Sequence, residues 1–475
     1  MNDSKTKLLY GSKLLLIRHV VGVLFSLAGT IVMSASLGME NWGYIATAIV
    51  VSVALEGFLS GNGISAYIIN KEELDSHDEA VANLCQLAIG VLFAAGTIVV
   101  TFIGLKWQNK PLNFLMVVVA IGTILVSLSS VPVALLARKM YFGYIGTIEL
   151  AGVVVFNVIS IGLSIFHTRI EYFGIAFLSK SFVVMILGFV FCRPRKLFGI
   201  RGFVNMVRFA SKISIANLGA WFIEGVAPLI AGAVLGTRIL GLYRIAYTLV
   251  NYPRVIIYVF GRVIYSLLSA EKDEVVRRNV LWQVFDGLNL IVIPVIFAIG
   301  ALSPVWTRLI YSSSWEELSK VFLLASIHWA FYTLPCLPIQ ALFAARRIRM
   351  VVIYFSIYVV VYMGGLVALK CFNSAAMPLA GIIISPLCLL VLTTFRKVYP
   401  GGGFALLWKE LVSLTLLSIL VWYIGFNYRI IALVLWLSGF GVWLIFTKDT
   451  FSTVAQFIKD FEIFKWRFNS KEIAV

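Results

Sequence analysis

The sequence predicts an all-α polytopic membrane protein of about fourteen transmembrane helices, arranged as two parallel six-helix lobes followed by two extra C-terminal helices. Three observations predict this class. The 475 residues are 61% hydrophobic and only 13% charged, whereas about a quarter of the residues of a soluble protein are charged. Apolar stretches of the roughly 20 residues that cross a bilayer follow one another along the chain. A motif after the first stretch returns in the second half.

The predicted spanning helices have short connections, and the longest connection runs from Arg193 to Lys212. The first stretch follows three lysines, as in a signal peptide, but it is too long for a signal core, so we assign it as a helix. The fourteen helices are predicted at 14–37, 42–69, 82–105, 113–137, 145–167, 172–192, 213–235, 241–268, 283–302, 319–343, 351–369, 376–394, 411–427 and 429–447.

The pattern L-G-x-x-x-x-G-x-x-x-x-A occurs from Leu37 to Ala48 and again from Leu235 to Ala246, at a constant offset of 198 residues. Each copy ends one apolar stretch and opens the next, and its glycines permit a tight turn between two helices. Six helices separate the copies, so the halves have the same orientation and are related by an axis along the membrane normal. The predicted domains are an N-lobe at 1–212, a C-lobe at 213–400, appended helices at 401–447 and an amphipathic tail at 448–475.

The distribution of lysine and arginine predicts that both chain ends face the cytoplasm. Basic residues in the connections on that side exceed those on the other side more than threefold. The net charge is +17, but the basic residues lie between apolar stretches and form no soluble basic face. Nucleic acid is therefore not an expected partner. Five scattered cysteines without a CxxC pair indicate neither a disulfide framework nor a zinc site. We expect no metal and no cofactor.

Basic side chains inside the predicted spans are candidates for a substrate path, because an ionisable group in mid-membrane is costly. Guanidinium binds phosphate oxygens bidentately, so three arginines on the 241–268 helix are typical of a path for phosphate or pyrophosphate. The alternative is that the outer two arginines reach the membrane surfaces and the middle one pairs with a carboxylate. Pro253 predicts a kink beside that middle arginine. The basic candidates are Arg18, Lys180, Arg244, Arg254 and Arg262.

Three acidic residues, Glu56, Glu224 and Asp286, either bind a coupling ion or neutralise a nearby basic side chain. His328 is isolated, and we expect it to be packed or hydrogen-bonded. The sequence has no GxSxG, P-loop or metal-spaced His/Cys/Asp cluster, and its outer connections are short. We therefore predict a protein that is not an enzyme, with a glycan polymerase or ligase as the less favoured alternative.

The run Leu235–Ser269, with LGLYRIAY at 240–247, resembles polysaccharide flippases of the Wzx and lipopolysaccharide-exporter type. Residues Leu37–Ala48, Arg138–Phe142 and Asn279–Leu309 are similar to the same family, which belongs to the MOP exporter superfamily with the MurJ and MATE transporters. The resemblance implies two six-helix lobes around a V-shaped cavity that opens alternately to each side. It also implies a polyprenyl-pyrophosphate-linked oligosaccharide as substrate.

One position departs from the family pattern. The acidic residue that the family often has nine positions before the turn glycine is Ala227 here, and Glu224 lies one turn earlier. Ion coupling therefore stays open.

We expect a flippase that moves the lipid-linked oligosaccharide from the inner to the outer leaflet through a cationic central cavity. It would act in O-antigen-type polysaccharide biosynthesis in the cytoplasmic membrane of a prokaryote. Expected partners are the substrate, membrane lipids and polysaccharide polymerase or assembly proteins. The alternative is a MATE-like small-molecule or drug antiporter, whose cavity would more naturally be dominated by carboxylates and aromatics.

Overall fold

The computed structural model confirms an all-α multi-pass membrane architecture. It describes residues 2–446, with gaps at 62, 72, 105–109, 140, 167–168, 255, 258–273, 312–314, 345–346, 386, 389–390, 393–394, 396–403 and 426–427. Within these residues, eight helices are long and apolar enough to cross a membrane, and two shorter apolar helices lie near the C-terminus. The number of fourteen helices and the cytoplasmic location of both ends stay predictions. The predicted tail at 448–475 lies outside the described residues.

The chain folds as two compact units, Met1–Arg244 (unit 1) and Ile245–Val475 (unit 2). The predicted lobe boundary at residue 212 stays a prediction. The described helical elements up to the middle of the chain are α1 Asn2–Gly61, α2 Ile64–Asn70, α3 Ser76–Val99, η1 Val100–Gly104, α4 Lys110–Arg138, α5 Phe142–Phe166, α6 Glu171–Phe191, α7 Phe203–Trp221, η2 Phe222–Val226, α8 Ala227–Leu235 and α9 Thr237–Asn251. Those that follow are α11 Glu274–Ala301, α12 Ser303–Ile310, α13 Glu316–Thr333, α14 Cys336–Ala344, α15 Ile348–Ala368, η4 Lys370–Ala375, α16 Ala376–Ile383, α18 Phe404–Gly425 and α19 Arg429–Phe446.

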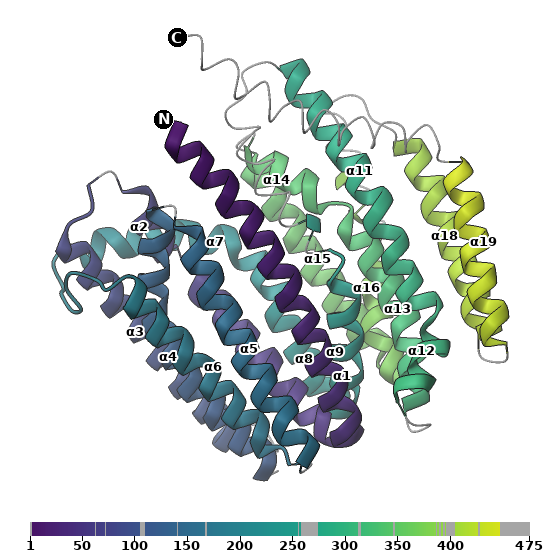
Figure 1. Ribbon diagram of the computed structural model, residues 1–475, viewed down its shortest axis with the longest axis horizontal. Coiled ribbons are helices and arrows are strands. Elements are labelled where there is room, and N and C mark those ends of the chain that lie inside the picture. The colour runs from purple at the N-terminus through teal and green to yellow at the C-terminus, as the bar shows by residue number, and fades with distance from the viewer. Residues whose placement is uncertain are drawn as a thin grey trace. The chain divides into compact units, whose positions relative to one another are not determined.

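Unit 1 is a bundle in which α4 packs against α3 and α6, and α5 packs against α6 and α1 (Figure 1). Its interior includes a cluster of small and branched apolar side chains around Ile68, Val81 and Leu136, to which α7 adds Met206 and Ala210. Serine and threonine hydroxyls inside these helices bond to carbonyls three or four residues earlier, as Thr123 does to Val119. Polar groups are thereby satisfied within a largely apolar bundle.

The two copies of the repeated motif form the same kind of turn. Gly38 has φ 76° and ψ 169°, and Gly236 has φ 97° and ψ 160°, conformations that only glycine adopts without strain. The first turn bends α1, which reverses direction at its far end in Figure 1, and the second separates α8 from α9. The prediction that each motif joins two helices through a glycine turn is confirmed.

The two turns also pack against each other inside unit 1. A Cβ atom on Gly241 would lie 2.9 Å from the Cα atom of Gly43, so the helices meet backbone to backbone. The indole of Trp42, 2% exposed, donates a hydrogen bond of 3.1 Å to the carbonyl of Gly241. Equivalent glycines of the two repeats therefore face one another across a contact that admits no side chain.

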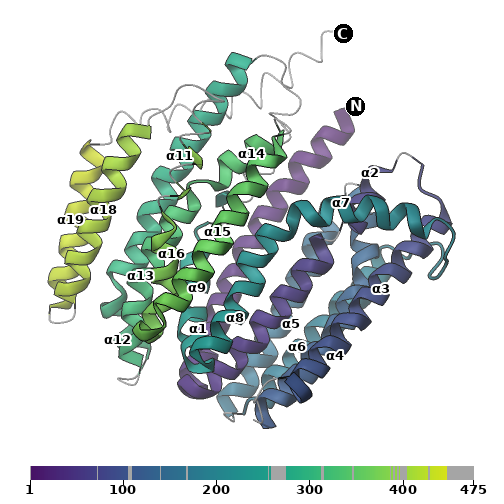
Figure 2. The same cartoon turned by 180° about the vertical axis from the view of Figure 1, so that it is seen from behind.

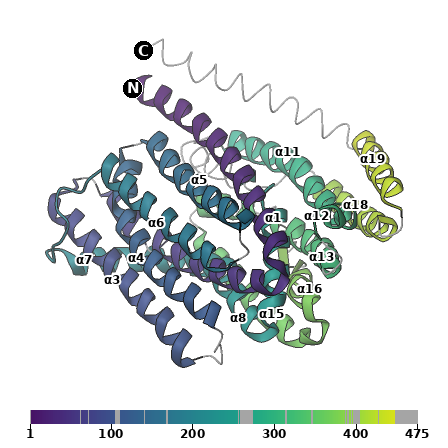
Figure 3. The same cartoon turned by 60° about the horizontal axis from the view of Figure 1, so that its bottom comes forward.

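Unit 2 contains the end of α9, followed by α11, α12, α13, α14, α15, η4, α16, α18 and α19. Helix α13 packs against α11 and α16, and α15 also packs against α16. Helices α18 and α19 lie side by side (Figure 3), and α18 contacts α11 and α12. These last two helices correspond to the predicted C-terminal pair.

Several predicted helices are interrupted in the structure. The predicted 42–69 helix is divided between α1 and α2, and the predicted 319–343 helix between α13 and α14. Two further interruptions bear on the candidate site. The predicted 213–235 helix consists of the end of α7, the π-helical segment η2 and α8. In the predicted 241–268 helix, α9 ends at Asn251 and residues 252–254 form a turn, because Pro253 has no amide hydrogen to continue the helix. Both interruptions lie beside predicted charged residues.

Candidate functional site

Glu56 on α1 and Lys180 on α6 form an ion pair inside unit 1. The ammonium of Lys180 lies 3.4 Å from a carboxylate oxygen of Glu56 and 5.6 Å from the ring centre of Phe177. Both charged side chains are more than a quarter exposed. An acidic candidate and a basic candidate, predicted for different roles, are thus brought together as partners.

The π-helical segment η2 lies against the same part of α1. The indole of Trp221 donates a hydrogen bond of 2.6 Å to the carbonyl of Ala54, and a Cβ atom on Gly225 would lie 2.8 Å from the Cα atom of Ala54. Glu224 belongs to this segment, although its side chain is outside the described part. Short π-helical segments within α-helices are frequent at functional sites. The backbone of Glu224 therefore lies close to the turn of α1 that carries Glu56.

Arg254 occupies the most enclosed charged position among the described residues of unit 2, with 1% of its surface exposed. Its guanidinium donates hydrogen bonds to the side-chain oxygen of Asn251 and to the sulfur of Cys336. The guanidinium carbon lies 4.5 Å from the ring centre of Trp329 and 4.9 Å from that of Tyr332. We call these five residues the Arg254 site.

The broken end of α9 positions this arginine. The amide of Arg254 donates to the carbonyl of Asn251 at 3.1 Å, and the carbonyl of Arg254 accepts from Ile257 at 2.9 Å. Because the chain turns at 252–254, the side chain of Arg254 reaches α13 and α14. Cation–π contacts with two rings hold a guanidinium where ordinary packing would exclude a charge.

An aromatic layer continues from the Arg254 site. His328 contacts the hydroxyl of Tyr358 at 2.9 Å, and Tyr332 packs edge-on against the same tyrosine. Tyr358 also stacks with Tyr362, while Tyr247 packs against the indole of Trp329. The expectation that His328 is packed and hydrogen-bonded is confirmed. Sequence analysis overlooked this layer, although the spacing of four residues between the α15 tyrosines predicts a shared helix face.

Of the remaining candidates, two lie on described helices with described side chains. Arg244 is half-buried on α9 at the end of unit 1, and Asp286 is half-buried on α11 in unit 2. Arg262 lies outside the described residues, as does the side chain of Arg18. The predicted row of Arg244, Arg254 and Arg262 therefore cannot be traced within the described part of the chain.

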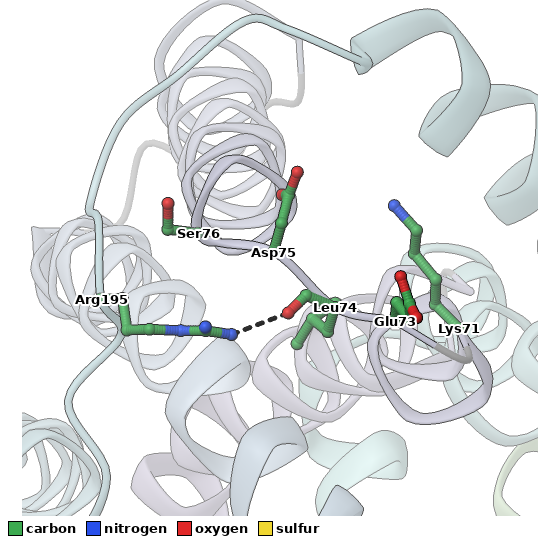
Figure 4. Close-up of a pocket in the computed structure, with 6 residues that line it drawn as sticks. All are labelled: Lys71, Glu73, Leu74, Asp75, Ser76 and Arg195. Carbon is green, nitrogen blue, oxygen red and sulfur yellow. Dashed lines mark hydrogen bonds between the residues drawn. The ribbon is translucent and has the colours of Figure 1, made fainter.

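Unit 1 also has a polar surface pocket of about 920 Å³ where the chain enters α3 (Figure 4). Its two basic groups are engaged with protein partners: Lys71 bonds to Asp78 at 2.5 Å, and Arg195 bonds to Glu79 at 2.8 Å. Burial lowers the pKa of Lys71, but its hydrogen bonds to Asp78 and Tyr67 outweigh that effect and the pKa is raised. These ion pairs hold the loops around the pocket together. The pocket is lined by Lys71, Glu73, Leu74, Asp75, Ser76 and Arg195.

Comparisons with solved structures place the fold. The lipid II flippase MurJ in an inward closed conformation matches with a TM-score of 0.65 and 14% identity, covering 92% of this chain and 99% of that one. A multidrug resistance MATE transporter of the MOP superfamily, in an inward-facing conformation, matches with a TM-score of 0.64 and 14% identity over 80% of this chain and 94% of that one. A MOP transporter from Pyrococcus furiosus, described as having a binding pocket of reversed polarity, has a TM-score of 0.52 and 14% identity, covering 83% and 96%.

No curated protein sequence matches the chain. A family model described as polysaccharide biosynthesis protein matches residues 32–320, more than half of the chain. The likeness to MurJ and MATE transporters describes the fold of the chain. The chain belongs to the polysaccharide biosynthesis protein family.

Proposed function

We propose that the protein is a flippase that carries a polyprenyl-pyrophosphate-linked oligosaccharide from the inner to the outer leaflet by alternating access. The observation that carries this proposal is membership of a polysaccharide biosynthesis family in a chain with the fold of membrane flippases. The proposed location is the cytoplasmic membrane of a prokaryote, with the substrate, lipids and polysaccharide assembly proteins as partners. The protein itself makes and breaks no covalent bond.

Such a substrate does not cross a bilayer unaided, because its phosphates and sugars would lose their hydration on entering the hydrocarbon. Cationic groups inside the spans lower that barrier, and a guanidinium offers two parallel hydrogen bonds to phosphate oxygens. The Arg254 site supports this role. At its two hydrogen bonds, a phosphate would compete with a neutral amide and a thiol, both weaker acceptors than a carboxylate.

The Arg254 site also explains how a buried guanidinium is stabilised when no substrate is bound. The rings of Trp329 and Tyr332 stabilise its charge through their faces, and each such contact contributes about 0.5–2 kcal/mol. Within unit 1, Lys180 is held by Glu56 and is a second cation that we propose for contact with the substrate. If the substrate phosphate displaced Glu56 from Lys180, binding of the negative substrate would break the Glu56–Lys180 ion pair.

The test is to delete the gene and measure on which leaflet the lipid-linked glycan accumulates, with an impermeant probe on spheroplasts. Wild type and Arg254 variants are then returned on a plasmid. Arg254→Met keeps the side chain's stacking surface and removes its charge, whereas Arg254→Lys keeps the charge without the fork. We expect inner-leaflet accumulation with Arg254→Met, and partial flipping with Arg254→Lys.

Arg308→Ala is the matched control, because Arg308 lies on α12 and forms an exposed ion pair of 3.6 Å with Glu316. We expect this variant to flip normally. Full rescue by Arg254→Met would remove Arg254 from the path but keep the flippase. Accumulation of single repeat units on the outer leaflet in the deletion strain would instead identify a polymerase or ligase.

A MATE-like small-molecule antiporter is the second candidate, and the Glu56–Lys180 pair favours it. A carboxylate and an ammonium at 3.4 Å inside a membrane bundle can exchange a proton for a bound cation. The same deletion strain separates the two functions. An unchanged lipid-linked glycan pool together with increased sensitivity to cationic drugs would support the antiporter.

A further inference from the structure

The connection between α6 and α7 combines exposed apolar and basic side chains in a way that the transport path does not require. Residues 193–212 contain six lysines and arginines and no acidic residue. Four bulky apolar side chains of this stretch are strongly exposed: Phe198 at 61%, Ile200 at 76%, Val204 at 65% and Val207 at 43%. Phe198 and Ile200 lie in irregular chain between the helices, so they are not part of a lipid-facing spanning helix.

Local structure turns this stretch along the end of unit 1. Gly202 has φ 91°, and the amide of Met206 bonds to its carbonyl at 3.1 Å, so α7 begins with a change of direction. Figure 2 shows α7 starting beside α2 and running at a marked angle to α3 and α4. The left-handed conformation at 202 requires a residue without a side chain.

The first turns of α7 present three different faces. Met206 and Ala210 enter the buried cluster of unit 1. At 100° per residue, Phe203, Val204 and Val207 form a second, exposed apolar face. Arg208 and Asn205 share the third face, which is exposed and polar. A soluble helix has one apolar face for its core; a second apolar face beside a basic one is typical of a helix at a membrane surface.

The irregular part is fixed to unit 1 by Arg195. Its guanidinium and its backbone amide both bond to the carboxylate of Glu79, at 2.8 Å and 2.6 Å. The guanidinium also donates to the carbonyl of Leu74 at 2.8 Å, the contact drawn in Figure 4. Gly199 approaches the Cβ atom of Ala80. The segment is thus held at 195 and 199, while Phe198 and Ile200 project away from unit 1.

We propose that residues 197–208, here the surface anchor, insert their apolar side chains into the headgroup region of an anionic lipid leaflet. Two features specify this occupant. Apolar side chains at these exposures are unfavourable in water, and a bilayer that covers them removes this cost. The basic residues among them, with no acid in the stretch, match anionic phospholipid headgroups, each contributing about 1 kcal/mol. The surface anchor is independent of the transported substrate.

The test places a spin label on the full-length protein reconstituted in nanodiscs that contain 30% phosphatidylglycerol. Each label is attached to a cysteine that replaces Phe198, Arg201, Val204 or Arg208. The background carries Cys371→Ser, because Cys371 is an exposed native thiol that would also be labelled. We expect labels at 198 and 204 to be relaxed mainly by oxygen, which partitions into lipid. Labels at 201 and 208 should be relaxed mainly by a water-soluble nickel complex.

Lipid charge is tested with Arg201→Glu/Arg208→Glu and with nanodiscs of phosphatidylcholine alone. At about 1 kcal/mol for each arginine, loss of both positive charges alone shifts the docked-to-undocked ratio about 30-fold, and repulsion of the two glutamates from the anionic headgroups adds to this shift. The label at 204 should then become accessible to nickel. Arg349→Glu, at an exposed arginine of α15, is the matched control and should change nothing.

Three results would overturn the surface anchor. The first is nickel accessibility at all four positions, which would place the stretch in water. The second is oxygen accessibility that ignores lipid charge, which would remove the anionic partner. The third is protection from both reagents, which would show that protein covers the stretch.

Discussion

Gly241→Ala tests the backbone contact between the two repeated turns. A Cβ atom at this position would lie 2.9 Å from the Cα atom and 3.1 Å from the nitrogen of Gly43, and 3.3 Å from the ring of Trp42. Two of these three atoms belong to the backbone of another helix, so no side-chain rotation can relieve the overlap. The helices must separate by several tenths of an ångström.

The expected cost follows from two opposing effects. Overpacking by one methyl group costs about 1–3 kcal/mol, and alanine gains about 0.5–1 kcal/mol over glycine inside a helix. Their difference is about 0–2.5 kcal/mol of destabilisation, and the upper part of this range applies because the overlap is with backbone atoms. Gly43→Ala should cost more, because its Cβ atom would lie 2.6 Å from the carbonyl oxygen of Thr237.

The assay is the apparent melting temperature of the purified protein in detergent, followed by intrinsic tryptophan fluorescence. Gly96→Ala is the matched control, since Gly96 lies in α3 of the same unit and a Cβ atom there would have nothing within 4 Å. We expect Gly241→Ala to lower the melting temperature, and Gly96→Ala to leave it unchanged or raise it slightly. Equal melting temperatures for the two variants would refute the close contact.

Three further predictions follow from unit 1. Glu56→Gln and Lys180→Met should each destabilise the protein more than the double variant does, because a single change leaves one charge unpaired; thermal unfolding of the four proteins should give a coupling energy of about 0.5–3 kcal/mol. The pKa of Asp75 is lowered, first by the hydrogen bond from the backbone of Asp78, so its contribution is complete above its ordinary pKa of 3.8 and is lost as the pH falls through the lowered value. Asp75→Asn should therefore flatten the loss of melting temperature below pH 3.8, and an unchanged pH profile would contradict this. An alanine at position 202 would be strained by about 1–2 kcal/mol at φ 91°, so Gly202→Ala should lower the melting temperature. Gly143→Ala, with open space around the added Cβ atom, should not lower it.

The sequence carried enough information for the fold class, because composition and apolar length are local properties. The repeated glycines at 38 and 236 were also readable, since a turn between two helices has a local signature. The packing of Gly43 against Gly241 was not readable in this way. Close approach of two helices separated by almost 200 residues depends on tertiary geometry that no short pattern encodes.

The candidate site shows the same division. Arg254 stood out in the sequence as a charge in an apolar stretch, and Pro253 predicted the break beside it. Its partners Trp329 and Tyr332 come from α13, far along the chain, and aromatic residues are too common in membrane helices to be singled out. The pairing of Lys180 with Glu56 likewise joins α1 to α6, and only the bundle decides which carboxylate an ammonium meets.

The contact between Gly43 and Gly241 has a consequence for the origin of the chain. Two equivalent positions of a pairwise repeat can touch only close to the local axis that relates the two turns, so this contact marks where that local axis passes within unit 1. In an ancestor made of two identical half-length chains, the same glycine would have met its own copy, and an isologous contact of this kind tolerates no side chain. Trp42 now donates to the carbonyl of Gly241, whereas the equivalent position in the second half is Leu240, which has no group to donate in return.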